Sequence, residues 1–226
     1  IKGEIINADS MQVYKEFSVL SSRPSKKDLK KAKHHLYGFQ PAKKLFSTGS
    51  WLKLVKKQIN LCLKNKKTPI LVGGTGLYFE AITKGMSKIP NINFKSRDEV
   101  RKLQKKIGQK KFYEKLLKLD PLIKNKIEPF DVQRSVRAYE VKKLTKKSIF
   151  EWYKLTKSEF KQFQIFKIFI DTPREKLLKN ISNRVKQMFK NDCIKEVKLF
   201  LELKIDHSLS VNKIIGVREI KDYLLG

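Results

Sequence analysis

The chain opens with an apolar segment that runs directly into a carboxylate, and this arrangement limits the folds it can adopt. Residues 4–8 read as a buried strand, and Asp9 and Ser10 follow it at once. A second apolar segment, residues 69–72, runs into a glycine-rich turn at residues 73–76. Apolar strands that end in such turns are typical of parallel sheets, whose ligand sites lie at the carboxyl ends of the strands.

Further segments extend this pattern along the chain. Residues 165–170 read as a third buried strand, and Thr172 is predicted to cap a helix that has Pro173 in its first turn. Helical periodicity is clear in three segments, residues 51–63, 177–189 and 193–203. Strands that alternate with helices predict an α/β fold with a mainly parallel sheet.

Residues 91–163 differ from the rest of the chain. They contain no convincing strand, and their short helical patterns are interrupted by Pro121 and Pro129. We therefore predict an all-helical insert at 91–163, within an α/β core formed by 1–90 and 164–226. The lysine runs at 26–33 and 102–111 are predicted to be solvated helix faces. The aromatic residues Phe160, Phe163, Phe166 and Phe169 indicate core packing more than base stacking.

The chain is strongly basic, with a net charge of +30 at 226 residues. Such a field attracts polyanions, and nucleic acid first among them. Only eight of the 52 basic residues are Arg, so part of the charge is equally explained by compositional drift toward Lys. Cys62 and Cys193 lie far apart without CxxC spacing, which argues against a disulfide framework or a zinc site and favours a reducing cytoplasm.

Three places in the sequence carry groups suited to chemistry. Asp9 can act as a general base or hold a hydrated magnesium ion, or it can simply cap a helix. The turn at 73–76 suits an anion, although it has neither the P-loop ending GK[ST] nor GxGxxG. Arg184 can clamp a diphosphate bidentately, and a structural, exposed Arg is the alternative.

Two further clusters carry polar or metal-ligating side chains. Residues 131–137 mix amide and guanidinium groups that can contact bases and phosphates, and the alternative role of Asp131 is a helix cap. His34 and His35 are adjacent, so they cannot share one helix face, and metal ligation by this pair is not expected. No metal ligand is assigned in this chain.

Taken together, the segments resemble the tRNA isopentenyltransferase family, also called tRNA dimethylallyltransferases, over essentially the whole chain. The matching strings, in order, are residues 7–14, Ser22-Arg23-Pro24, His34-His35-Leu36, residues 71–78, Ile89-Pro90 with Arg97, residues 131–137 with Glu140, Arg184 with Met188 and Glu196-Val197, and residues 215–219. Each string alone is weak, but their combination and order are specific.

The resemblance implies a P-loop-kinase-like three-layer core, classed with ATP-binding proteins, and a helical tRNA-binding insert. It implies a monomeric enzyme that transfers a dimethylallyl group from dimethylallyl diphosphate, with Mg²⁺, to N6 of the adenosine 3′ to the tRNA anticodon (position 37). By resemblance Asp9, Thr75 and Arg184 are catalytic: Asp9 accepts the amine proton, and the other two meet the diphosphate. The implied tRNA contacts are Asp9, Ser10, Met11, Gln12, Thr75, Arg97, Asp131, Val132, Gln133, Arg134, Ser135, Lys213, Ile214, Ile215, Gly216, Val217 and Arg218.

The chain also departs from the family pattern. The family's N-terminal strand and P-loop, GPTxxGK[ST], and its basic C-terminal segment are not found in these residues, and Asp192 stands where Gly is usual. We therefore expect a fragment of a longer protein, which alone is inactive in transfer. Two other classes fit the same residues: a small-molecule kinase or ATPase on this core, and a non-catalytic RNA-binding remnant. Dependence on a prenyl diphosphate rather than ATP separates the first alternative from a transferase.

Overall fold

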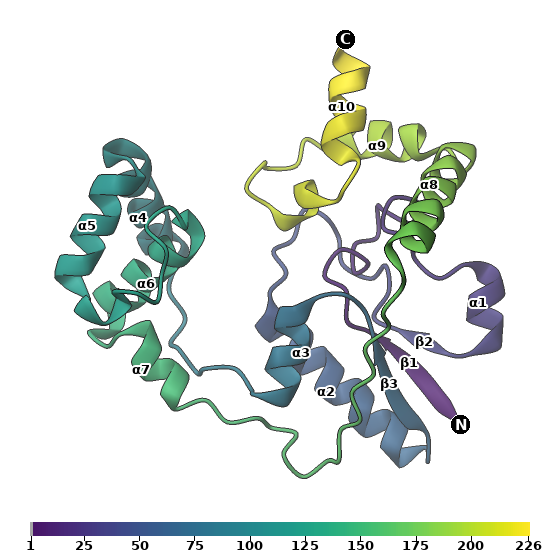
Figure 1. Cartoon of the computed structure of the whole chain (residues 1–226), viewed down its shortest axis with the longest axis horizontal. Helices are drawn as coiled ribbons and strands as arrows, with labels where there is room; N and C mark the ends of the chain where they lie inside the picture. Colours follow the sequence, from purple (N-terminus) through teal and green to yellow (C-terminus); the bar gives the residue numbers. More distant parts are fainter. Residues whose placement is uncertain (1) are drawn as a thin grey trace. The chain divides into compact units, whose positions relative to one another are not determined.

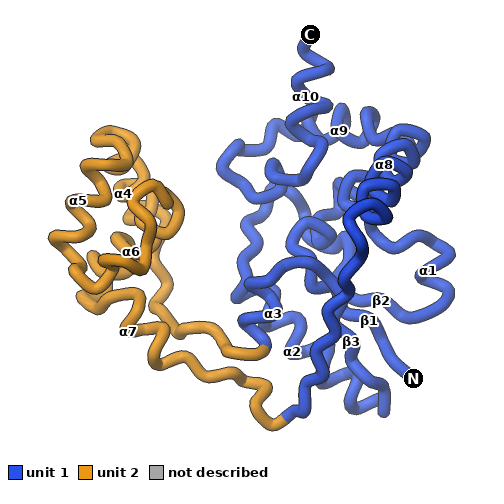
Figure 2. Tube along the Cα trace, viewed as in Figure 1, with its two compact units in different colours: residues 1–82, 163–226 blue, residues 83–162 orange. Residues whose placement is uncertain are grey.

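The computed structural model describes residues 2–226, which divide into two compact units (Figure 2). The first unit comprises Ile1–Ile82 and Phe163–Gly226, and the second comprises Thr83–Gln162. The expected boundaries of the helical insert were 91 and 163. The second unit therefore also takes in the segment that leads from the core into its first helix.

A three-stranded parallel sheet lies in the first unit (Figure 1). Its strands are β1 (Gly3–Asn7), β2 (His34–His35) and β3 (Thr68–Val72), in the order β2-β1-β3. The predicted strands at 4–8 and 69–72 are thus confirmed, as is the α/β class. Because β1 and β3 are parallel, their carboxyl ends meet at one edge, where Asp9 and the turn at 73–76 follow.

Helix α2 (Thr48–Lys64) packs its apolar stripe against this sheet. Its buried residues are Trp51, Val55, Ile59 and Cys62, spaced by four, four and three positions as one helix face requires. The Ser47 side chain accepts a hydrogen bond from the Ser50 amide and caps the first turn. Helix α3 (Gly76–Thr83) begins directly after the turn that ends β3. The sheet and α2 therefore give the carboxyl ends of the strands a rigid support.

The prediction of a third strand at residues 165–170 is wrong. Residues 165–170 pair with no strand, and the side chains of Phe166, Ile168 and Phe169 are 80%, 87% and 89% exposed. Their apolarity predicts burial, but a strand also needs backbone partners, and the sheet ends at β3. The expectation that Phe166 and Phe169 are core residues is wrong for the same reason, whereas Phe160 is buried.

The segment that follows forms helix α8 (Arg174–Lys190), and its first turn also differs from the prediction. Pro173 is the N-cap residue, and no side chain caps the helix, so Thr172 does not have the predicted role. Helix α1 (Lys26–Lys31) buries none of its residues, which confirms the solvated helix predicted for the first lysine run. Strand β2 was not predicted, because two residues carry no periodicity.

The C-terminal elements of the first unit are α9 (Cys193–Glu202), the short 3-10 helix η2 (Ser210–Lys213) and α10 (Val217–Leu225). They pack with residues 13–20 into a core in which the rings of Phe17 and Phe200 lie 4.7 Å apart. Asp192 adopts a left-handed conformation with φ of 62° and caps α9 through the Lys195 amide. A capping carboxylate therefore replaces the glycine usual at this helix junction.

The second unit is entirely helical over its described elements. They are α4 (Phe94–Ile107), α5 (Gln109–Leu119), the 3-10 helix η1 (Pro121–Ile123), α6 (Val132–Thr145) and α7 (Ile149–Lys154). Its core includes Phe112, Leu116, Ile123 and Val141, which are fully buried. As predicted, Pro121 and Pro129 lie outside the α-helices. Among residues 2–226, no helix combines the length and apolarity needed to cross a bilayer.

Candidate active site

The turn after β1 holds the Asp9 carboxylate in place. The buried Asn7 side chain accepts a hydrogen bond from the Asp9 amide at 2.8 Å and donates to the carbonyls of Asp9 and Leu36 at 2.9 and 3.0 Å. Asp9 Oδ1 in turn accepts the Met11 amide at 2.8 Å. These bonds leave Asp9 Oδ2 directed toward Gly74, where an added Cβ would lie 3.9 Å away. The Asp9 carboxylate is therefore fixed through one oxygen, and the other is available to a substrate.

The turn after β3 is bonded to the turn after β1. Thr75 Oγ1 accepts the Ser10 amide at 2.9 Å and donates to Ser10 Oγ at 3.2 Å. The backbones also approach closely, since a Cβ on Gly73 would lie 2.2 Å from the Ala8 carbonyl carbon. Only glycine fits there, which accounts for the glycine-rich turn. The structure thus brings together Asp9, Ser10 and Thr75, all three named from the sequence.

Two stacked aromatic side chains pack beneath the backbone of these turns, on the side of α2 and α3. Trp51 and Tyr78 are buried, their rings stack at 4.0 Å, and Trp51 Nε1 donates to the Asn7 carbonyl at 2.9 Å. Burial, together with the charges of Tyr14 and Asp9, raises the pKa of Tyr78. Burial and the Asp9 charge likewise raise the pKa of Tyr37. Both phenols therefore stay protonated at neutral pH.

A chain of hydrogen bonds leads from this turn to Arg184. The Gln12 side chain, two positions beyond Ser10, donates to the carbonyls of Ser21 and Ser22 at 2.9 and 3.0 Å. Ser22 Oγ then accepts from Arg184 Nε at 2.8 Å, across 162 residues of sequence. Arg184 lies on α8, so this contact attaches α8 to the loop that Gln12 holds. The predicted catalytic residues Asp9 and Arg184 are thus connected, although they do not touch.

Arg184 lines an open pocket of about 690 Å³ with a basic character. Its lining residues are Ser18, Val19, Ser22, Arg23, Pro24, Ser25, Leu29, His34, Tyr37, Arg184, Gln187, Met188 and Asn191, and none of them carries a carboxylate. The Arg23 guanidinium occupies the space beside Gly38, where any Cβ would overlap it. The buried Nε of Arg23 has no hydrogen-bond partner. Two arginines in a lining without acidic residues suit an anionic ligand, although Arg23 also donates to the Lys15 carbonyl at 3.2 Å and feels the charges of Glu196 and Glu16.

One carboxylate outside the pocket orders its rim. Glu196 on α9 accepts hydrogen bonds from the backbone amides of Ser18, Val19 and Leu20. Leu20 in turn packs against Gly216, whose φ is 97° and which a Cβ would crowd at 3.0 Å. The predicted tRNA contacts at 213–218 therefore lie beside this rim. In that segment Lys213, Ile215 and Arg218 are exposed, whereas Ile214 and Val217 are buried.

The remaining predicted tRNA contacts lie in the second unit. Asp131 caps α6: it accepts the Arg134 amide at 2.9 Å and the Arg134 Nη1 at 2.7 Å, while the Arg134 side chain remains 76% exposed. Val132 and Gln133 are exposed as well. Ser135 is fully buried and accepts a hydrogen bond from Gln109 at 3.2 Å, so it supports α6 from inside. Arg97, on α4, has a buried Nε without a partner.

Sequence reasoning missed several residues of the pocket. Tyr37 carried no motif of its own, and Ser22 and Arg23 were noted only as part of a matching string. Trp51 was read simply as one apolar position of a helix. The usable signal was the retention of Arg in a chain that otherwise uses Lys, because Arg23 and Arg184 are two of only eight arginines.

Comparison with known proteins gives consistent results. A family model described as IPP transferase matches residues 12–226. A curated tRNA dimethylallyltransferase of Pelagibacter ubique (strain HTCC1062) is 55% identical over 224 residues, which are 99% of this chain and 72% of the relative. A protein of the same name from Rickettsia bellii (strain OSU 85-389) is 40% identical over 223 residues, 98% of this chain and 70% of the relative.

Solved structures agree with these sequence matches. The full-length tRNA isopentenylpyrophosphate transferase of Bacillus halodurans has a TM-score of 0.64 and 28% identity, covering 99% of this chain and 69% of its own. A eukaryotic dimethylallyltransferase acting on tRNA has a TM-score of 0.81 over 98% of this chain and 57% of its own, and at 24% identity it supports the fold alone. With the site geometry and the matched family model, these likenesses show that the chain belongs to the IPP transferase family.

Proposed function

We propose that the protein transfers a dimethylallyl group from dimethylallyl diphosphate to N6 of the adenosine 3′ to the anticodon of tRNA. The observation that carries this proposal is the hydrogen-bonded connection between the Asp9 turn and a basic pocket free of carboxylates. Family membership supplies the reaction class. A monomeric state, a cytoplasmic location and ATP-type nucleotide affinity of the core belong to the same proposal.

The residues suit the chemistry of each substrate. The exocyclic amine of adenosine is a weak nucleophile because its lone pair is delocalised into the ring. As the nitrogen bonds to C1 of the dimethylallyl group and the C1–O bond breaks, the amine proton passes to Asp9 and diphosphate leaves. The leaving diphosphate gains negative charge, which the guanidinium groups of Arg184 and Arg23 stabilise. Asp9 therefore acts as a general base, and the two arginines act on the leaving group.

The oxygen groups near the turn fit the Mg²⁺ that the family implies. Asp9 Oδ2, Ser10 Oγ and Thr75 Oγ1 are hard oxygen ligands of the kind Mg²⁺ prefers. One carboxylate and two hydroxyls are too few for a complete octahedron, which matches an ion that keeps water and phosphate oxygens as its other ligands. When bound, the ion would neutralise diphosphate charge. Because Asp9 Oδ2 is also the proposed base, Asp9 would hold a water of the ion and not the ion itself.

Binding of tRNA is assigned to exposed groups of both units. Lys213, Ile215 and Arg218 are candidates in the first unit, and Gln133 and Arg134 in the second. The overall charge of +30 favours a polyanion, and the target base must leave its stack to reach a carboxylate at a sheet edge. Buried residues of the predicted set, Ser135 among them, support these contacts without making them.

The proposal is tested by single-turnover transfer to an anticodon stem-loop, with the chain alone and with a chimaera that carries the N-terminal segment of the Pelagibacter relative. We expect the chimaera to be active, and the same assay on the 226 residues alone measures how much of the transfer activity they carry. In the chimaera, Asp9→Asn should lower the transfer rate by about two to four orders of magnitude while tRNA affinity changes little.

Asp98, whose side chain is 40% exposed and pairs with Lys102 on α4, offers a matched control. Asp98→Asn should transfer at the wild-type rate. A near wild-type rate in the Asp9→Asn chimaera would remove Asp9 from catalysis. Activity with ATP and a small acceptor, without use of the prenyl diphosphate, would instead support a kinase.

A further inference from the structure

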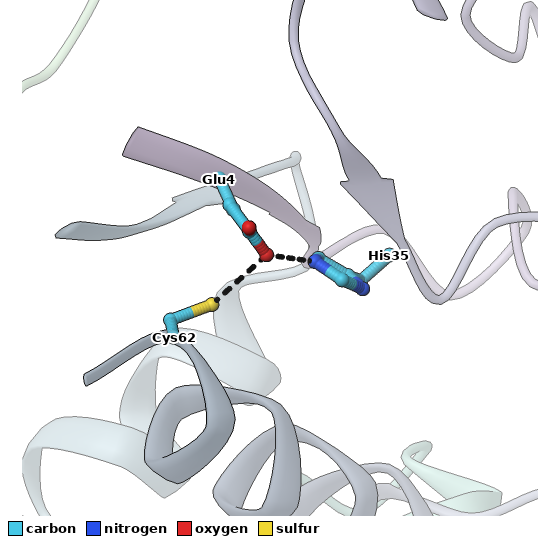
Figure 3. A group of neighbouring side chains, drawn as sticks. All are labelled: Glu4, His35 and Cys62. Carbon is cyan, nitrogen blue, oxygen red and sulfur yellow. Dashed lines mark hydrogen bonds and ion pairs between the residues drawn. The ribbon is translucent and has the colours of Figure 1, made fainter. Parts of the chain in front are cut away.

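Three potential metal ligands from distant parts of the sequence converge between β1, β2 and α2 (Figure 3). Glu4 lies on β1, His35 on β2 and Cys62 in the last turn of α2. Glu4 Oε2 lies 2.6 Å from His35 Nε2 and 3.6 Å from Cys62 Sγ. The three ligand atoms all lie within 4.8 Å of one another.

The cluster is enclosed by the fold. Cys62 is fully buried, and the side chains of Glu4 and His35 are 11% and 13% exposed. Strand register places His35 beside Ile6, and Glu4 shares the face of β1 that Ile6 occupies, toward α2. Since the packing of β1, β2 and α2 fixes all three side chains, the arrangement does not depend on a loop.

We propose that Glu4, His35 and Cys62 bind a zinc-type divalent ion, separate from the transfer site. A thiolate, an imidazole and a carboxylate are the ligand set that zinc accepts, and a thiolate is unsuited to Mg²⁺. Three protein ligands leave a fourth tetrahedral position to water. Glu4 lies three residues before the end of β1, about 10 Å of extended backbone from Asn7, and Asp9 follows in the turn beyond, so the ion would not act in transfer.

The distances suit such an ion. In a tetrahedral zinc site the ligand atoms lie roughly 3.2–3.6 Å apart. The Glu4–Cys62 separation of 3.6 Å already lies in this range, and the Glu4–His35 pair, now at 2.6 Å, must open by roughly 0.6–1.0 Å. In the metal-free arrangement the Cys62 thiol donates a hydrogen bond to Glu4 Oε2. A second hydrogen bond joins the same oxygen to His35 Nε2. The protons of both hydrogen bonds must leave these ligand atoms when the ion enters.

One neighbouring cation must be taken into account. Lys33 Nζ lies 3.9 Å from Glu4 Oε2, but its side chain is 66% exposed and can turn to solvent. Burial, with the Glu4 charge, raises the pKa of Cys62, and the hydrogen bond from His35 lowers the pKa of Glu4. A bound ion would replace the proton on the Cys62 sulfur and bind that sulfur more strongly than Glu4 does. It would also link the two-residue strand β2 to β1 and α2. We expect it to stabilise the first unit.

Cobalt titration of the metal-free chain tests the proposal, because a thiolate bound to Co²⁺ gives a near-ultraviolet charge-transfer band. The wild-type chain should show this band, and Cys62→Ser should lose it. Cys193→Ser is the matched control, since Cys193 is equally buried but packs in the separate core around Phe17. It should keep the band unchanged. His35→Gln should weaken Co²⁺ binding by roughly tenfold or more.

A second measurement needs no variant and so does not depend on whether a variant folds. X-ray absorption of the wild-type chain loaded with Zn²⁺ should show one sulfur among nitrogen and oxygen ligands. The melting temperature should also rise with Zn²⁺. A shell of nitrogen and oxygen alone, no cobalt band in the wild type, or a band that persists in Cys62→Ser would overturn the proposal and leave a hydrogen-bonded triad of purely structural function.

Discussion

Thr75 Oγ1 and Ser10 Oγ lie 3.2 Å apart, and the same Thr75 oxygen accepts the Ser10 amide at 2.9 Å. These two bonds join the turn after β3 to the turn after β1 across 65 residues of sequence. Ser10 directly follows Asp9, so the position of the Asp9 carboxylate depends on the Thr75 side chain. A residue assigned to the diphosphate by family likeness thus also positions the proposed base.

This contact predicts the effect of removing one hydroxyl. Thr75→Val keeps the shape of the side chain but leaves the Ser10 amide without its acceptor. The free energy of unfolding should fall by about 1 kcal/mol, as for a lost and partly buried hydrogen bond. Transfer in the active chimaera should fall as well. Urea unfolding and single-turnover assays measure the two effects separately.

Thr75→Ser is the matched control, because it keeps the hydroxyl and loses only a methyl group. It should restore most of the stability and most of the transfer rate. If Thr75→Val unfolds like the wild type, the bond does not stabilise the turn and the positioning role is wrong.

Arg184 should act on the diphosphate through the shape of its guanidinium and not only through its charge. Arg184→Lys keeps the charge but loses both the bond from Nε to Ser22 and the bidentate fork. The apparent affinity for dimethylallyl diphosphate should fall, while tRNA affinity stays nearly unchanged. Arg174→Lys, at the exposed start of the same helix and outside the pocket lining, serves as the control and should change neither. A defect mainly in tRNA binding would contradict the assignment.

Much of this site was accessible from the sequence. The strands at 4–8 and 69–72 follow from apolar runs ended by polar turns, and Asp9 and Ser10 follow from their place after the first strand, whereas Thr75 was named through the family resemblance. The direct contact of Thr75 with Ser10 was not accessible, because adjacency of β1 and β3 is a tertiary property. Local pattern therefore identified the residues but not their bonds.

The failed strand prediction has a physical cause of the same kind. Residues 165–170 have a strand-like composition, yet pairing depends on what lies beside them, which composition does not encode. The expectation that the His34-His35 pair binds no metal stays a prediction, and it considered the two residues only as neighbours in sequence. Strand alternation points them to opposite faces, so the informative partners of His35 are Glu4 and Cys62, which lie far away in sequence.

The second unit should bind tRNA partly through Arg134. Its side chain is 76% exposed, although it pairs with Asp131. If it contacts a phosphate, Arg134→Ala should weaken stem-loop binding and reduce the slope of log affinity against log salt by about one. Lys57→Ala, on the exposed face of α2, should leave both unchanged. Equal salt slopes for wild type and Arg134→Ala would remove Arg134 from the phosphate contacts.

Asp131 should make the stability of α6 depend on pH. The Arg134 amide, which donates to its carboxylate, holds the pKa of Asp131 below its ordinary value of 3.8. The stabilisation by the charged form is therefore fully present above that value and is lost as pH falls through the lowered pKa. At pH 7, Asp131→Ala should destabilise α6 by about 1 kcal/mol, measured by hydrogen exchange of its amides. Asp131→Asn should keep much of the capping stabilisation but lose its pH dependence. If the stability of α6 falls equally with acid in the wild type, Asp131→Ala and Asp131→Asn, this account is wrong.

The unpaired segment at 165–170 should limit the solubility of the chain. Ile168, Phe169 and Ile170 are 87%, 89% and 83% exposed in a run with unpaired backbone groups, which is a template for pairing with another chain. Phe169→Lys should therefore raise the concentration at which the protein begins to aggregate, measured by light scattering, because it adds charge to that run. Phe130→Lys is the matched control: Phe130 is 83% exposed but has no comparable run around it, so its replacement should have little effect. Equal gains from both substitutions would show that exposed phenylalanine, and not an unpaired strand-like segment, drives the association.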